Sequence, residues 1–186
     1  MEIIQNDLDG VVLIKPNLFK DDRGYFFESY NSIDFNEKLN AKIDFIQDNE
    51  SMSNFGTLRG FHLQLPPHSQ SKLVRVTSGK VQDVVIDLRP YSEYFGNYKS
   101  YILSDENKHQ LFIPKGFAHA FLVLSKSAIF NYKVDYQYTP NYDTGLIWND
   151  ADINVDWEID KSVINLSAKD LLLPNFKNYK KKNFQL

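Results

Sequence analysis

The chain has 186 residues, of which 42% are hydrophobic and 15% aromatic, enough apolar side chains to fold one domain with a real core. Its formal net charge of -3 argues against a general affinity for nucleic acid. Without cysteine it can form neither disulfides nor a thiolate nucleophile, and no apolar run is long enough to cross a bilayer. The first residues lack the basic and apolar regions of a signal peptide, so we expect a cytoplasmic protein.

Short apolar or alternating segments, punctuated by glycine and proline, predict about ten β-strands and little helix. The main expected strands cover residues 11–14, 25–30, 47–53, 57–64, 72–76, 81–88, 98–103, 110–113 and 128–138. Ser32 can cap a helix at 32–39, another short helix is expected at 171–173, and residues 175–186 are predicted to be a flexible tail. The tight turn at 78–80 indicates antiparallel strands. The pattern favours one all-β sandwich or barrel over residues 1–186.

Residues 47–64 concentrate side chains that carry chemistry. We predict two strands joined by a turn at 54–56. Alternation places four polar side chains on one face of the first strand, and that face either meets solvent or lines a bound ligand: Gln47, Asn49, Ser51 and Ser53. In the second strand, alternation places Arg59 and His62 on opposite faces, so a pocket shared by both requires a bulge at Gly60.

Lys72 shares a face with Val74 and Val76, and it either points into the interior or extends to water from the strand end. An aromatic stripe at 130–138 is expected to be mostly core, and only a phenol that faces a cavity would bear on function. On residue type alone, Arg23 and Glu28 are consistent with surface charges.

The segment 114–119, Pro-Lys-Gly-Phe-Ala-His, resembles the second motif of the cupins, which are double-stranded jelly rolls. A typical first cupin motif carries two histidines and a glutamate that bind a metal. The matching stretch here, His62-Leu63-Gln64, has one histidine. Because a metal needs several converging ligands, we expect a metal-free site.

Six motifs stand in the order found in dTDP-4-dehydrorhamnose 3,5-epimerases. They are Arg23-Gly24 with Phe27-Glu28, Gln47-Asp48-Asn49, Leu58-Arg59-Gly60-Phe61-His62, Lys72-Leu73-Val74-Arg75, the segment 113–119, and Leu166-Ser167-Ala168-Lys169-Asp170. The chain therefore closely resembles this family over nearly its whole length. The resemblance implies a cupin-type jelly roll with a few short peripheral helices, no cofactor, and a dTDP-4-keto-6-deoxyhexose as substrate. It also implies a homodimer whose N-terminal strands are exchanged.

The resemblance also implies roles for individual residues. His62 would be the general base, Tyr132 the general acid, and Asp170 the residue that orients the histidine. Lys72 would hold the C4 oxygen of the sugar. The implied substrate-binding residues, some of them reaching the neighbouring subunit, are Arg23, Glu28, Gln47, Asp48, Asn49, Arg59, His119, Tyr138, Asp143 and Lys169.

Two residues depart from the family pattern. Ala120 replaces a usual glycine. Asp143 stands where a glutamate is common, and its side chain shortens the implied contact to the sugar or nucleotide by one methylene. Asp170 also has a structural explanation, because Ser167 and Asp170 have the spacing of a capping box.

The residue types suit epimerisation beside a ketone. Loss of the proton at C3 or C5 of a 4-keto sugar gives an enolate with its charge on O4, and return of a proton to the other face inverts the carbon. This chemistry needs a base, an acid across the ring and a cation at O4, as His62, Tyr132 and Lys72 would provide. The alternatives are an epimerase acting only at C3 or C5, a sugar-binding cupin without catalysis, and a metal-dependent cupin oxygenase.

Overall fold

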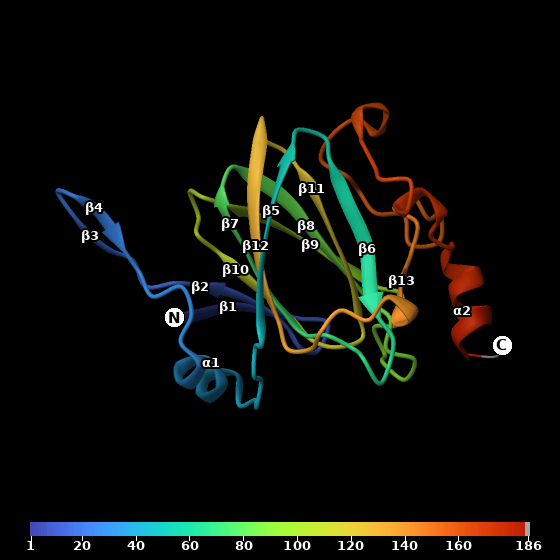
Figure 1. Cartoon of the computed structure of the whole chain (residues 1–186), viewed down its shortest axis with the longest axis horizontal. Coiled ribbons are helices and arrows are strands. Elements are labelled where there is room, and N and C mark those ends of the chain that lie inside the picture. The colour runs from blue at the N-terminus through green and yellow to red at the C-terminus, as the bar shows by residue number, and fades with distance from the viewer. Residues whose placement is uncertain (185–186) are drawn as a thin grey trace.

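Two antiparallel β-sheets pack face to face in the computed structural model, which describes the backbone of residues 1–184 and the side chains of residues 1–180 (Figure 1). The six-stranded sheet has the order β1-β2-β10-β7-β12-β5 and the five-stranded sheet the order β13-β6-β11-β8-β9. The first contains β1 (Glu2–Asp7), β2 (Val11–Lys15), β5 (Gln47–Asn54), β7 (Lys72–Ser78), β10 (Gln110–Ile113) and β12 (Ser127–Val134). The second contains β6 (Leu58–Gln64), β8 (Lys80–Asp87), β9 (Tyr98–Ser104), β11 (Phe117–Val123) and β13 (Asp143–Gly145).

Helical structure is brief and peripheral. The two α-helices are α1 (Ser32–Leu39) and α2 (Phe176–Phe184), and the 3-10 turns are η1 (Pro140–Tyr142), η2 (Lys161–Val163) and η3 (Asp170–Leu172). Neither α-helix, within the part of the chain that is described, has the length and apolar character needed to cross a membrane. The predicted all-β jelly roll with a few short helices is confirmed.

Strand alternation divides the apolar residues of the five-stranded sheet between two cores. On β8, Val81 and Val85 face the six-stranded sheet, whereas Val84 and Ile86 belong to a second core on the outer face. The C-terminal segment covers that outer face, with Trp157 among the buried residues. Because β8 and β11 are buried on both faces, their inward side chains lie between the sheets, where a site can form.

The turns after β5 and β7 carry the chain from one sheet to the other. β5 and β7 lie in the six-stranded sheet, while β6 and β8, which follow them directly, lie in the five-stranded sheet. The strands predicted at 72–76 and 81–88 therefore do not pair with each other, because they lie in different sheets. At the second crossing Gly79 has φ +81, and an added Cβ would clash with the carbonyl oxygen of Ser127, so glycine is required there.

Three predicted boundaries need correction. The strand expected at 25–30 ends at Phe26, because β4 (Gly24–Phe26) pairs only with the three-residue β3 (Phe19–Asp21), and this hairpin projects from the body of the molecule (Figure 1). The strand expected at 128–138 ends at Val134, after which the Asp135 carboxylate accepts a hydrogen bond from the Ser71 amide at 2.6 Å. The cap of α1 is Asn31, whose side chain accepts from two backbone amides, and not Ser32.

The segment predicted to be a flexible tail begins with a helix. α2 begins at Phe176, and the side chains of Phe176 and Tyr179 are buried against the outer core of the five-stranded sheet. Asp150 holds the start of this helix, because its carboxylate accepts a hydrogen bond from the Phe176 amide at 2.7 Å. Two aromatic anchors three residues apart therefore fix a segment whose lysine content had suggested a solvated end.

Candidate active site

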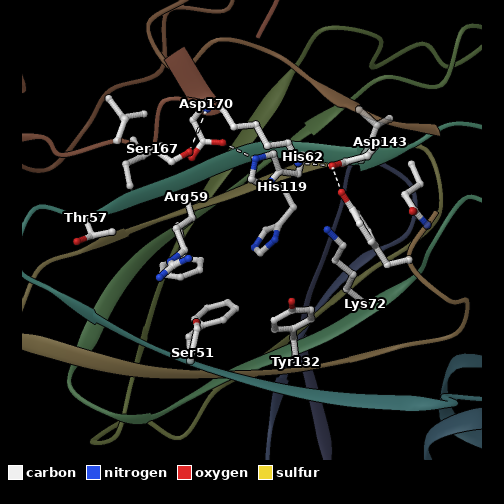
Figure 2. Close-up of a pocket in the computed structure, with 18 of the residues that line it drawn as sticks. Ser51, Thr57, Arg59, His62, Lys72, His119, Tyr132, Asp143, Ser167 and Asp170 are labelled. Carbon is white, nitrogen blue, oxygen red and sulfur yellow. Dashed lines mark hydrogen bonds and ion pairs between the residues drawn. The ribbon is translucent and has the colours of Figure 1, made fainter. Parts of the chain in front are cut away.

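A cavity of about 610 Å³ opens between the two sheets. Strands β6 and β11 form one wall, β7 and β12 form the opposite wall, and the segment 165–170 closes one side (Figure 2). The predicted site residues that line it are Arg59, His62, Lys72, His119, Tyr132, Tyr138, Asp143, Lys169 and Asp170.

A one-residue irregularity in β6 brings Arg59 and His62 into the same cavity. His119 pairs with His62 and Phe121 with Arg59, so a step of three residues on β6 matches a step of two on β11. This is the bulge at Gly60 that a pocket shared by Arg59 and His62 needs. Gly60 has φ +120, and a Cβ there would clash with the main chain at His119, so the backbone of the bulge needs glycine.

His62 is held by a carboxylate from the C-terminal segment. Its Nε2 lies 2.6 Å from Oδ1 of Asp170, and the carboxylate is buried. Burial alone would raise the pKa of Asp170, but hydrogen bonds from His62 and Ser167 and the nearby positive charges hold that pKa below its usual value. Since Asp170 occupies Nε2, Nδ1 is the ring nitrogen left to accept a proton from a ligand.

Ser167 explains how Asp170 is placed. Its hydroxyl accepts a hydrogen bond from the Asp170 amide at 3.1 Å, which is one half of the expected capping box. The carboxylate of Asp170, which would complete that box, is directed to His62 instead. The backbone amide of Asp170 thus takes part in capping, whereas its carboxylate contacts His62.

The side chain of Lys72 points into the interior. Of the two positions expected from the sequence, interior or water, the structure shows the first. Lys72 opens β7 opposite Val134 of β12, and its side chain lines the cavity. Burial lowers the pKa of Lys72 to about 8, while the negative charges of Asp143 and Asp83 oppose that shift. Its ammonium group is thus easily deprotonated for a lysine, yet two carboxylates support the charged form.

Tyr132 comes from the sheet that faces His62. It lies on β12, and Figure 2 shows its ring directed into the cavity, toward the wall that carries His62 and His119. Burial raises the pKa of Tyr132, and the positive charge of Arg59 reduces that shift, so the phenol keeps its proton at neutral pH. The imidazole of His62, the phenol of Tyr132 and the side-chain amine of Lys72 therefore surround one cavity.

The polar face of β5 meets the cavity only at one end. Ser51 lines the cavity, and Ser53 accepts a hydrogen bond from Nε of Arg59 at 3.1 Å. Gln47 and Asn49 lie farther along the strand and bond to each other at 2.7 Å. The face thus lines the cavity in one part and is an exposed edge in the other.

An ionic cluster forms part of the cavity rim. Tyr138 donates a hydrogen bond to Asp143 at 2.8 Å, and Lys169 forms an ion pair with the same carboxylate oxygen. The hydrogen bond to Asp143 raises the pKa of Tyr138. Burial alone would lower the pKa of Lys169, but the bond and the charge of Asp143 raise it. Asp143 therefore joins two substrate-binding candidates, whereas Ala120 lies in the outer core and does not line the cavity.

Five expected substrate-binding residues do not line the cavity of their own chain. Arg23 is exposed on the β3–β4 hairpin and pairs with Asp21 at 2.5 Å. Glu28 lines a separate cavity beside α1. Asp48 pairs with Lys133 at 2.6 Å across β5 and β12, and the remaining two are Gln47 and Asn49.

Asp83 is a site residue that the sequence reasoning missed. Its carboxylate is fully buried, and both of its oxygens lie near Nε2 of His119, at 3.0 and 2.9 Å. One sequence feature could have indicated it: Asp83 lies between Val81 and Val85, the inward-facing residues of an apolar strand. That position is unusual for aspartate and could have marked it as paired.

Among the described residues, no three histidine, cysteine, aspartate or glutamate side chains converge as metal ligands would. The two cavity histidines each direct Nε2 to their own carboxylate, Asp170 and Asp83. The donor set is therefore arranged as two histidine–carboxylate pairs, a pattern typical of proton transfer and charge pairing.

The fold and the site define a cupin-type jelly roll with an acid–base pocket. The chain belongs to the dTDP-4-dehydrorhamnose 3,5-epimerase family, whose model matches residues 5–178. Members of this family are isomerases that act on carbohydrates, and this chain is such an isomerase.

Individual relatives match this chain over almost its full length. The dTDP-4-dehydrorhamnose 3,5-epimerase of Escherichia coli (strain K12) is 46% identical over 170 residues, which cover 91% of each chain. The crystal structure of the epimerase from Elizabethkingia anophelis NUHP1 superposes with a TM-score of 0.92 at 44% identity, covering 96% of this chain and 97% of that one. The epimerase of Legionella pneumophila Philadelphia 1, solved with dTDP-4-keto-L-rhamnose, gives a TM-score of 0.90 at 40% identity and covers 95% and 93%.

Proposed function

We propose that this protein epimerises dTDP-4-dehydro-6-deoxy-D-glucose at C3 and C5 to give dTDP-4-dehydro-L-rhamnose. One observation carries the proposal: His62 with Asp170 on one wall faces Tyr132 on the other, with Lys72 lining the same cavity. A base and an acid on opposite sides of a bound ring are what inversion at carbon requires. A protein that only binds sugars has no need of them.

In the proposed reaction Nδ1 of His62 takes the proton from C3 or C5, and Asp170 stabilises the imidazolium that results. The electrons of the C–H bond move into an enolate, whose oxygen at C4 is met by the ammonium of Lys72. Tyr132 then donates its phenolic proton to the opposite face of the carbon. Proton exchange with water restores both groups, and repetition at the second carbon completes the conversion.

The diphosphate and nucleotide are assigned to the outer part of the cavity. Arg59 presents a guanidinium fork and Lys169 an ammonium, which are the groups that suit phosphate oxygens. The complex of the Legionella pneumophila relative with dTDP-4-keto-L-rhamnose supports the choice of a dTDP-linked keto sugar. Tyr138 and Asp143, at the rim, are proposed to contact the nucleotide or sugar.

We also propose a homodimer in which the β3–β4 hairpin reaches the neighbouring subunit. The hairpin projects from the body, and its Phe26 is 70% exposed, with Phe19 and Tyr25 also exposed beside it. Such a contact would carry Arg23, and with it Glu28, toward a partner's cavity, while Gln47, Asp48 and Asn49 lie on the edge strand β5 that a partner could approach. A cytoplasmic location stays a prediction, which cell fractionation would test.

Solvent exchange tests the function directly. The purified protein is incubated with dTDP-4-dehydro-6-deoxy-D-glucose in deuterated water, and the products are analysed by NMR and mass spectrometry. Deuterium at both C3 and C5 supports double epimerisation, whereas deuterium at one carbon indicates a single epimerase acting on a related sugar. Substrate that is recovered unchanged, with no deuterium at C3 or C5, would indicate a protein that only binds the sugar nucleotide and would contradict the proposal.

A further inference from the structure

The cavity contains two histidine–carboxylate pairs side by side. His62 and His119 are register partners on the adjacent strands β6 and β11. Each directs Nε2 to its own aspartate, His62 to Asp170 and His119 to Asp83. Two similar pairs on one wall raise the question of which histidine moves protons and what the other does.

The two pairs differ in their access to solvent. The side chain of His62 is 31% exposed and can exchange protons with water in the cavity. The side chain of His119 is 8% exposed and that of Asp83 is 0% exposed. Phe130 stacks on the His119 ring, with their centroids 6.0 Å apart. The second pair is therefore shielded, and its geometry is fixed from two sides.

Asp83 has one hydrogen-bond partner for its side chain in the described part of the chain, and that partner is His119. The nearby hydroxyl of Tyr101 on β9 donates to Asp7 instead. An ionised carboxylate in a low-dielectric interior is costly unless a cation is paired with it. The imidazolium form of His119 supplies that cation in direct contact, whereas Lys72 acts on Asp83 only at longer range.

We propose that Asp83 is a positioning residue that keeps His119 as an imidazolium, which donates from Nδ1 to the bound sugar. This inference rests on the proposed function and adds to it a residue and a division of labour. His119 is a fixed charged donor, and the neighbouring His62 is the histidine that takes and returns protons. The donor adds to Lys72 where oxygen charge develops in the enolate.

The positive charges of Arg59 and Lys72 in the same cavity disfavour an imidazolium at His119, and the buried carboxylate of Asp83 is the group that offsets them. β6 carries Arg59 and His62, β7 carries Lys72, and β12 carries Tyr132, and all four line the same cavity. Apart from the Asp170 that His62 already occupies, Asp83 on β8 is the carboxylate in contact with a cavity histidine. Loss of the Asp83 charge therefore removes the group that holds a proton on Nε2.

The first test observes the protonation of the ring without substrate. The nitrogen chemical shifts of 15N-labelled histidines are recorded at pH 7.5 in the native protein and in Asp83→Asn, with His119→Gln identifying the resonances of residue 119. We expect imidazolium shifts for both His119 nitrogens in the native protein and a single neutral tautomer in Asp83→Asn. A neutral His119 ring in the native protein would overturn the proposal, and this result does not depend on any enzymatic activity.

The second test asks whether Asp83 acts through His119. Asp83→Asn should lower kcat about 10- to 100-fold while the Kd for dTDP, which lacks the sugar, changes less than about threefold. In a His119→Gln background the same substitution should have no further effect on kcat. An equal loss of kcat in both backgrounds would assign Asp83 a merely structural role. If the native protein incorporates no deuterium from solvent, the proposed function fails, and the NMR result still decides the pairing.

Discussion

The Asp170 carboxylate lies 2.6 Å from Nε2 of His62, although 108 positions separate the two residues in the chain. Asp170 stands in a C-terminal turn that is capped by Ser167, and His62 follows the bulge in β6. The proposed base therefore depends on the C-terminal segment being folded against the five-stranded sheet. Both ends of this contact are fixed by local features that can be changed one at a time.

Replacing His62 with alanine should remove solvent exchange while dTDP still binds. A general base contributes roughly 100- to 10,000-fold to the rate, and a loss in that range is expected in the deuterium assay. Affinity for dTDP, measured by calorimetry, should change little because the imidazole is assigned to the sugar. His109→Gln is the matched control, since His109 does not line the cavity. Turnover that persists in His62→Ala would exclude His62 as the base.

The rate should fall on the alkaline side as Lys72 loses its proton. Burial lowers the pKa of Lys72 to about 8, so its ammonium is present below that pH and disappears as the pH rises through it. Only the charged form stabilises the enolate, and kcat should therefore decline above about pH 8. The pKa of Tyr132 is raised by burial, so its phenol stays protonated over the same interval.

Lys72→Arg provides the control for this pH dependence. Because a guanidinium stays charged throughout the accessible range, the variant should be slower than the native protein but lack the decline near pH 8. The measurement is kcat against pH between 6 and roughly 10, with stability followed in parallel to exclude unfolding. The same alkaline decline in the arginine variant would assign it to another group.

Subunit complementation should reveal whether Arg23 serves the neighbouring cavity. Arg23→Ala and His62→Ala are each expected to be inactive or nearly so. In an equal mixture refolded together, half of the dimers would be mixed, and one of their two sites would be intact, which predicts about a quarter of native activity. Arg59→Ala mixed with His62→Ala is the control, because Arg59 and His62 line the same cavity. Recovery in neither mixture would argue against the exchanged hairpin.

The C-terminal helix should contribute to stability through its buried aromatic anchors. Tyr179→Ala removes a side chain that is 1% exposed, and a loss of about 3 kcal/mol in the free energy of unfolding is expected. Lys177→Ala, an exposed neighbour on the same helix, should change it by less than about 0.5 kcal/mol. Urea unfolding measures both. Equal effects of the two substitutions would mean that α2 does not pack as described.

The order of the motifs was enough to predict the family and the grouping of His62, Lys72, Tyr132 and Asp170 around one cavity. Local alternation could not assign Lys72 to the interior, because a strand-end lysine can equally reach water. Alternation also predicted a bulge at Gly60 only if Arg59 and His62 share one pocket. The strand pairing that shows the bulge involves β11, which lies more than fifty residues later in the chain.

Other features had no local signal. A tight turn between two apolar strands looks the same whether the strands pair or enter opposite sheets, so the crossings after β5 and β7 could not be foreseen. Lysines dominate the composition of the last residues, which concealed the anchoring role of Phe176 and Tyr179. Asp83 becomes informative only when its burial and its contact with His119 are known.

The crossing of the chain between sheets makes catalysis sensitive to the thickness of the sandwich. His62 and Tyr132 lie on different sheets, so any swelling of the interior would move the proposed proton acceptor away from the proposed proton donor. A loosening of about 1 Å in mild denaturant should lower turnover roughly 100-fold while every strand still keeps its neighbours. The rate of turnover should therefore report on how closely the two sheets pack against each other.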